Sequence, residues 1–145
     1  MAARLSYMFD TSVFTHMQHR SVVASMDELE GEMVVANMTC LEYGFSAVSA
    51  AQWVARQEVI AGLAQVAETI NVDFVRGLEV QQLLAERGLK GRKPPDLLIA
   101  AMAERLGAIV VHYDNDYALI SDVTGQPNHW IVPQGSLAPT ATGKD

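Results

Sequence analysis

Residues 95–106 read PDLLIAAMAERL, and this stretch decides which fold the chain can adopt. Apolar side chains fall on nearly every face of a helix over residues 96–106, so we expect that helix to be central and buried. Gly107 then ends the helix, and the apolar run 108–112 predicts a strand directly after it. A buried helix beside a buried strand is typical of a sheet that carries helices on its faces.

Further strands and helices alternate along the chain before and after this stretch. Apolar runs predict strands over residues 5–9, 33–36, 67–72 and 130–132, and helical patterns fall between them, over 13–20, 22–30, 39–60, 73–87 and 117–121. In the first helix Thr11 and Ser12 are the expected caps. Strands separated by helices predict an α/β fold with a mostly parallel central sheet that is covered on both faces. The length of 145 residues suits one domain, which we place at residues 1–133, followed by a flexible tail over 134–145.

Composition and charge narrow the class of protein. Half of the residues are hydrophobic and 19% are charged, so the chain has enough apolar material for a core. The net charge of −7 argues against passive nucleic-acid binding, but it leaves room for a nuclease whose acidic residues hold cations. No apolar run reaches the roughly 20 residues that span a bilayer, and we expect no membrane association. The single Cys40 fits a reducing environment, so we expect a cytoplasmic protein.

Four carboxylates stand at the ends of predicted elements. Asp10 and Asp114 each follow a strand, and Glu42 and Asp96 each lie in the expected first turn of a helix. In an open parallel sheet the carboxyl ends of the strands and the starts of the following helices share one edge, where binding sites form. All four acids are therefore expected to converge.

Such a cluster needs cations, because two carboxylates about 4 Å apart repel by roughly 4 kcal/mol at an effective dielectric near 20. Oxygen-rich clusters suit Mg²⁺ or Mn²⁺. Each acid also has a simpler interpretation. Asp10 and Asp96 fit the positive end of a helix, Thr39 and Glu42 match a capping box, and Asp114 with Asp116 fits a polar turn.

Four short motifs resemble the PIN-domain family and, within it, the VapC toxins of bacterial toxin–antitoxin pairs. They are YMFDTSV at 7–13, MVVANMTCLEYG at 33–44, PDLLIAAMA at 95–103 and VVHYDNDY at 110–117. Their order and spacing cover nearly the whole chain up to Pro133. Relatives often carry Thr or Ser two residues before the fourth acid, where this chain has His112.

The resemblance implies a three-layer α/β/α PIN-like fold and a metal-dependent endoribonuclease that cleaves transfer RNA or ribosomal RNA. It implies that a metal-bound water attacks the phosphodiester and leaves 5′-phosphate and 3′-hydroxyl ends. It also implies a homodimer, held by a VapB-type antitoxin whose C-terminal segment lies beside the first helices. The implied residues are the four acids as catalytic and Mg²⁺ or Mn²⁺ ligands, Asp116 as a secondary ligand, and Thr11 or Ser12 as groups that order water or phosphate.

Basic residues gather just before Asp96. Arg87, Lys90, Arg92 and Lys93 form the densest basic patch of the sequence. The patch is expected either to bind RNA phosphates or to be a solvated loop. The apolar residues Phe14, Val22, Val23 and Met26 line an antitoxin groove in one interpretation and are ordinary packing in the other.

Two other functions stay open at this point. The first is a non-catalytic acidic α/β module that binds a partner protein, in which the acids only cap helices. The second is a related metal-dependent DNA nuclease. Binding of Mn²⁺ through the four acids separates the first from a nuclease, and activity on single-stranded RNA against branched DNA separates the second.

Overall fold

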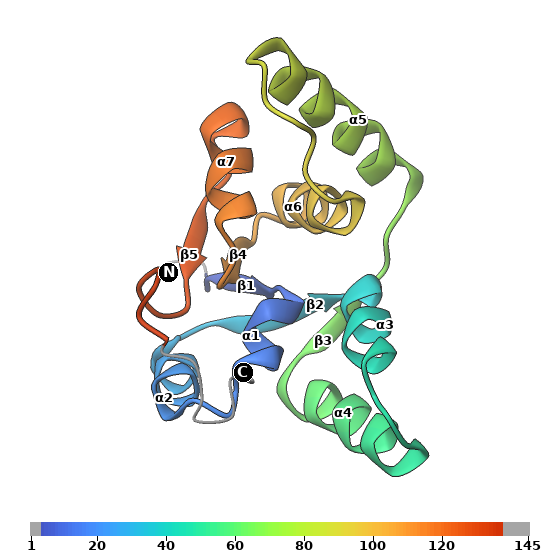
Figure 1. The fold of residues 1–145 in the computed structure, drawn as a ribbon, viewed down its shortest axis with the longest axis vertical. Helices are drawn as coiled ribbons and strands as arrows, with labels where there is room; N and C mark the ends of the chain where they lie inside the picture. The colour runs from blue at the N-terminus through green and yellow to red at the C-terminus, as the bar shows by residue number, and fades with distance from the viewer. Residues whose placement is uncertain (1–3, 138–145) are drawn as a thin grey trace.

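A five-stranded parallel sheet forms the centre of the chain (Figure 1). The structure is a computed structural model, and it describes residues 4–137. The strands are β1 (Ser6–Phe9), β2 (Glu32–Ala36), β3 (Gln65–Ala67), β4 (Ile109–His112) and β5 (Asn128–Trp130). Their order in the sheet is β3-β2-β1-β4-β5, and every neighbouring pair is parallel. The predicted parallel sheet is confirmed.

Helices cover both faces of this sheet. On one face lie α5 (Asn71–Glu86), α6 (Pro94–Leu106) and α7 (Asn115–Thr124), which share an apolar core with the sheet. On the other lie α1 (Thr11–Thr15), α2 (Arg20–Glu28) and α4 (Ala50–Leu63), around a second core, while α3 (Asn37–Phe45) lies near the β2–β3 end of the sheet (Figure 1). The three-layer α/β/α fold expected from the sequence is therefore confirmed.

Helix α6 is the most buried helix among residues 4–137. Residues 96–103 of α6 are all buried, because α6 packs against α5 and α7 as well as against the sheet. Gly107 ends α6 with a φ of 67°, a left-handed conformation that glycine adopts without strain.

The chain reverses direction across the sheet at β1. After β1 it builds β2 and β3 on one side, and it then returns through α5 and α6 to build β4 and β5 on the other. Strands β1 and β4 are neighbours with Phe9 opposite Val111, and the backbone N–H of Asp10 donates to the carbonyl of Val111 at 2.9 Å. Ligands of open α/β sheets bind at such a switch point, outside the carboxyl ends of the strands.

The single long helix predicted over 39–60 is wrong. Two helices stand there, because the chain turns after Phe45 and α4 begins afresh where the hydroxyl of Ser49 accepts the N–H of Gln52 at 3.1 Å. The capping box of Thr39 and Glu42 is wrong as well. Thr39 is buried inside α3, whose N-cap is Ala36, so Glu42 lies in the second turn.

Other element boundaries differ by a few residues. The third strand is residues 65–67, because the carboxylate of Asp73 accepts the backbone N–H of Ile70 at 2.9 Å and closes a helical turn that begins at Asn71. Helix α1 ends at Thr15, and its cap is Asp10. The last strand is residues 128–130.

The apolar residues of the first two helices are mostly core. Phe14, Val22 and Met26 are 2%, 0% and 3% exposed, so of the four residues considered for a groove only Val23 reaches the surface.

The predicted tail over 134–145 lies only partly within the described residues. Its residues 138–145 are outside them. Within residues 4–137, the backbone N–H of Leu137 donates to the hydroxyl of Tyr113 at 3.2 Å. No helix in this described part is long and apolar enough to cross a membrane.

Candidate metal centre

Asp10 lies at the carboxyl end of β1 and uses its two oxygens differently. Oδ2 caps α1 by accepting the backbone N–H of Ser12 at 3.0 Å and the Ser12 hydroxyl at 2.6 Å. Oδ1 points to the other side and accepts the hydroxyl of Tyr117 at 2.6 Å. Asp10 is 4% exposed. Capping therefore occupies only one of its oxygens and leaves the other turned towards the remaining acids.

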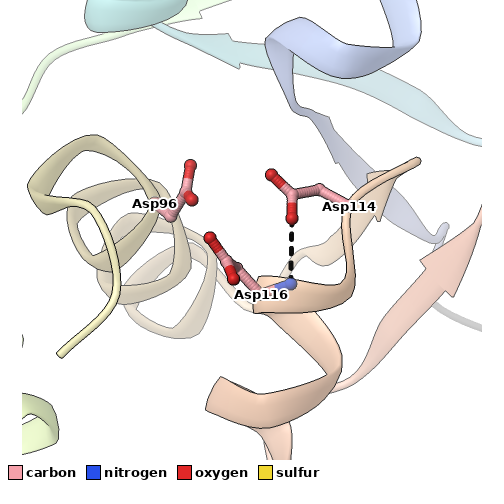
Figure 2. Close-up of side chains that lie close together, drawn as sticks. All are labelled: Asp96, Asp114 and Asp116. Carbon is pink, nitrogen blue, oxygen red and sulfur yellow. Dashed lines mark hydrogen bonds between the residues drawn. The ribbon is translucent and has the colours of Figure 1, made fainter. Parts of the chain in front are cut away.

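Asp114 repeats this division of roles at the end of β4. Its Oδ1 caps α7 by accepting the backbone N–H of Asp116 at 2.9 Å, which Figure 2 shows. Its Oδ2 faces the amino group of Lys93 at 3.7 Å. Carboxylate oxygens of Asp96, Asp114 and Asp116 lie within 4.8 Å of one another (Figure 2). Asp116, expected to be a secondary member, belongs to this closest group.

Asp96 is the least compensated of these acids. It lies in the first turn of α6, where the two prolines that begin the helix and the helix dipole suit a carboxylate. It is nevertheless 4% exposed, and within residues 4–137 no group makes a hydrogen bond to its Oδ2. Burial raises the pKa of Asp96 to about 8, and the charges of Asp10 and Asp114 add to the rise. A buried acidic oxygen without a donor is costly, so this atom calls for a cation.

Tyr117 connects Asp10 at the end of β1 with Asp96 at the start of α6. This contact was not predicted from the sequence. The hydroxyl of Tyr117 donates to Asp10 at 2.6 Å and lies 3.3 Å from Oδ1 of Asp96. Burial, with the nearby acids, holds the pKa of Tyr117 well above its usual value, so the hydroxyl stays a donor. The available signal was the position of Tyr117 in the first turn of the helix that follows Asp114.

Glu42 approaches Asp10 from α3. The hydroxyl of Thr11, next to Asp10, donates to Glu42 Oε1 at 2.8 Å. Burial raises the pKa of Glu42 against the effect of this hydrogen bond, and the charge of Asp10 raises it further. Glu42 is therefore electrostatically part of the cluster, although it stands outside the closest group of three.

The hydroxyl groups of Thr11 and Ser12 both donate to carboxylates as the structure places them. Thr11 donates to Glu42, and Ser12 donates to Asp10 while accepting the backbone N–H of Tyr113 at 2.9 Å. These contacts hold the acids in position, and Ser12 also ties the end of β1 to the chain after β4. The expected ordering of water or phosphate by these hydroxyls stays a prediction.

His112 stands where relatives often carry Thr or Ser, and its ring contacts the backbone of Asp114. Its Nδ1 accepts the backbone N–H of Asp114 at 3.1 Å, so the ring proton lies on Nε2, which faces Asn128 Oδ1 at 2.7 Å. Burial lowers the pKa of His112, which keeps the ring neutral. The exchange of hydroxyl for imidazole thus leaves Asp114 anchored, and Asn128 is a supporting residue that the sequence did not indicate.

The basic patch divides into two parts. Arg87 and Lys90 are exposed, as a solvated loop would be. Arg92 donates to Asp116 at 3.1 Å and to the carbonyl of Lys90 at 2.7 Å, and Lys93 faces the acids. The two residues nearest to α6 therefore offset the charge of the cluster, and binding of RNA phosphates by the patch stays a prediction.

The donor set of this site fits a hard divalent cation. It offers carboxylate oxygens from several elements, which is the chemistry that Mg²⁺ and Mn²⁺ prefer. It also holds the buried Oδ2 of Asp96, which no protein donor satisfies. A cation held by such oxygens can activate water and neutralise charge on a phosphodiester.

The chain is similar to known proteins over most of its length. The PIN domain family matches residues 7–123. The chain is 41% identical over 135 residues to "Ribonuclease VapC51" of Mycobacterium tuberculosis, covering 92% of this chain and 98% of that protein. It is 38% identical over 139 residues to "Ribonuclease VapC18" of the same organism, covering 90% and 98%.

Solved structures share the fold at low identity. The VapBC2 complex of Rickettsia felis bound to a promoter DNA fragment matches with a TM-score of 0.72 at 15% identity, over 87% of this chain and 99% of that one. Mycobacterium tuberculosis VapC20, described as a sarcin–ricin loop cleaving toxin, matches with a TM-score of 0.62 at 12% identity, over 78% and 93%.

Proposed function

This chain belongs to the PIN-domain family and, within it, to the VapC ribonucleases, and on that premise we propose that it is a metal-dependent endoribonuclease toxin of a toxin–antitoxin pair. The proposed ligands of Mg²⁺ or Mn²⁺ are Asp10, Glu42, Asp96, Asp114 and Asp116. The observation that carries the proposal is Oδ2 of Asp96, which is buried without a hydrogen bond beside the carboxylates of Asp114 and Asp116.

The bound cation supplies an activated water and offsets the charge that develops on the phosphodiester. The residues of the chain hold the geometry for this step. Tyr117 keeps Asp10 and Asp96 facing each other, and His112 fixes the backbone of Asp114. The hydroxyl of Tyr117 stays protonated and adds no negative charge to the pocket, and the neutral ring of His112 adds no positive charge that would offset the acids.

RNA is the proposed substrate, with transfer RNA first and ribosomal RNA second. Two exposed basic residues, Arg87 and Lys90, support contact with a polyanion, because their side chains face solvent in the basic loop. The proposed setting is the cytoplasm, where such RNA is found. The alternative, a related DNA nuclease, would cleave branched DNA in place of single-stranded RNA.

Protein partners are part of the proposal. The solved relatives include VapBC complexes, and a VapB-type antitoxin and a homodimer are proposed for this chain. The exposed apolar side chains of α3 and α4 support a protein interface, since Leu41, Phe45 and Trp53 are 76%, 81% and 51% exposed.

The alternative of a purely structural set of caps does not account for Asp96. Asp10 and Asp114 do cap helices. The N-cap of α6 is Lys93, and no side chain caps that helix. A protein-binding module does not require a buried carboxylate at this position.

The test is cleavage of total RNA by the purified protein with Mg²⁺ or Mn²⁺. We expect Asp10→Asn and Asp96→Asn to lose cleavage and toxicity while keeping the fold, and EDTA to stop the wild-type reaction. Asp27→Asn is the matched control, because Asp27 is exposed on α2. Full cleavage by a clean Asp96→Asn protein would overturn the proposal.

A further inference from the structure

Among residues 4–137, the side chain of Lys93 is the cationic group that faces Oδ2 of both Asp96 and Asp114. Lys93 is the N-cap of α6, and its Nζ lies 3.9 Å from Asp96 Oδ2 and 3.7 Å from Asp114 Oδ2. Both distances exceed a direct hydrogen bond, so the ammonium is held by charge over the two carboxylates. Its side chain is 68% exposed, so solvent reaches it freely.

The two oxygens that Lys93 faces are the ones left over by the other contacts. Oδ2 of Asp96 has no hydrogen-bond partner, and the other oxygen of Asp114 caps α7. Arg92 differs, because it is tied to Oδ1 of Asp116 and to the carbonyl of Lys90. Of the two basic residues at the pocket, only Lys93 thus stands over the oxygens that a divalent cation would use.

We propose that Lys93 is a resident counter-cation that competes with the divalent ion for Oδ2 of Asp96 and Oδ2 of Asp114, and so sets the affinity of the metal site. The proposal rests on the metal site of the proposed function. An ammonium and a divalent cation cannot share these oxygens, because like charges a few ångströms apart repel. The exposed, flexible stem of Lys93 lets the ammonium leave towards solvent when the metal binds.

A competing counter-cation has two effects of opposite sign. It stabilises the protein without metal, because it offsets repulsion among the buried acids, and it weakens metal binding, because the metal must displace it. A residue with only a structural role would lower stability when removed and would leave metal affinity unchanged or reduced. The sign of the affinity change therefore separates the two roles.

The experiment measures Mn²⁺ binding by calorimetric titration and thermal unfolding in EDTA for the wild type, Lys93→Gln and Lys93→Arg. We expect Lys93→Gln to bind Mn²⁺ about tenfold more tightly, from the loss of one charge close to the ion, and to unfold at a lower temperature in EDTA. Lys93→Arg, which keeps the charge, should stay close to the wild type. Lys90→Gln is the matched control, because it removes the same charge from the same loop at an exposed position.

The outcomes separate the two proposals. Wild-type protein that binds no Mn²⁺ at millimolar concentration would overturn the proposed metal site itself. Wild-type protein that binds Mn²⁺, together with a Lys93→Gln variant that binds it equally well or more weakly, would overturn the competition while leaving the metal site intact. Tighter binding by Lys90→Gln to the same extent as by Lys93→Gln would also overturn it, because the effect would then come from net charge alone.

Discussion

Two buried aspartates in this protein have opposite electrostatic surroundings. Asp73, at the start of α5, is fully buried, yet its Oδ1 accepts Nε of Arg105 at 2.8 Å, and its Oδ2 accepts Nη2 of Arg105 at 3.0 Å and the N–H of Ile70 at 2.9 Å. Asp96, on the neighbouring α6, has a buried oxygen with no donor and faces other acids.

The pKa values follow this contrast. Burial pushes the pKa of Asp73 upwards, but the hydrogen bonds from Arg105 and Ile70 outweigh it and leave the pKa below its usual value. At Asp96 burial and the neighbouring acids act together and raise the pKa to about 8. Burial of an acid thus does not by itself indicate function. The missing hydrogen-bond donor does, because a structural carboxylate accepts its hydrogen bonds from the protein, whereas a ligand carboxylate is left for its ion.

The largest expected difference between substitutions of Asp73 and Asp96 is in the free energy of unfolding, measured in EDTA. Asp73→Asn should lower the free energy of unfolding by about 1.5–3 kcal/mol, because it weakens the charged hydrogen bonds that Arg105, itself partly exposed, makes to this buried side chain. Asp96→Asn should raise the free energy of unfolding, because Asp96 is ionised in the unfolded protein at neutral pH and must bind a proton or bury its charge on folding, and Asn has no such cost. Urea unfolding at pH 7.5 measures both. A loss of stability in Asp96→Asn equal to that in Asp73→Asn would erase the contrast.

The pH dependence of stability sharpens the same comparison. Asp96 has a folded pKa above its unfolded value, so the folded protein binds the extra proton and the wild type loses stability as pH rises from about 4 to 8. Asp73 has a lowered folded pKa, so its contribution is present above the unfolded value of about 4 and is lost as pH falls below it. Each slope is at most about 1.4 kcal/mol per pH unit. Urea unfolding across pH 3 to 8 measures both slopes. Asp96→Asn should flatten the fall in the free energy of unfolding between about pH 4 and 8, and Asp73→Asn should flatten the fall below about pH 4.

A smaller effect is expected at the residue that holds Asp96 and Asp10 together. Tyr117→Phe removes the hydroxyl that contacts both acids, and supporting hydrogen bonds of this kind change metal affinity by about 10-fold to 100-fold. We expect a loss of about tenfold in Mn²⁺ affinity, near the low end of that range. Tyr43→Phe is the matched control, since the Tyr43 ring packs on Phe14 in the core on the opposite face of the sheet. Equal affinities in wild type and Tyr117→Phe would show that the tyrosine only fills space.

The sequence predicted the layers of the fold and the edge of the sheet where the acids meet, because both follow from local patterns. The apolar residues 96–103 indicated a buried helix, and strand ends indicated Asp10 and Asp114. The order of the strands did not follow from any local pattern, since the pairing of β1 with β4 joins residues about a hundred positions apart.

Contacts that depend on tertiary packing were missed for the same reason. The break between α3 and α4 lies at residues 46–49. Gly44 and Ser49 were local signals for it that the Ala-rich residues on either side outweighed, and Thr39 with Glu42 imitated a helix start. The support given by Tyr117 and by Asn128 comes from side chains that reach across elements. The pairing of Asp73 with Arg105 was equally invisible, because 32 positions separate the two residues.

Titration of Mn²⁺ into wild-type protein and Asp96→Asn at pH 8, with Asp27→Asn as the control, tests directly whether Asp96 binds a metal ion. We expect saturable binding to the wild type and to Asp27→Asn, and loss of that binding in Asp96→Asn, whose circular dichroism spectrum should show the fold retained. Equal Mn²⁺ binding by the wild type and Asp96→Asn would contradict the claim that the buried, unpartnered carboxylate of Asp96 belongs to a metal ion.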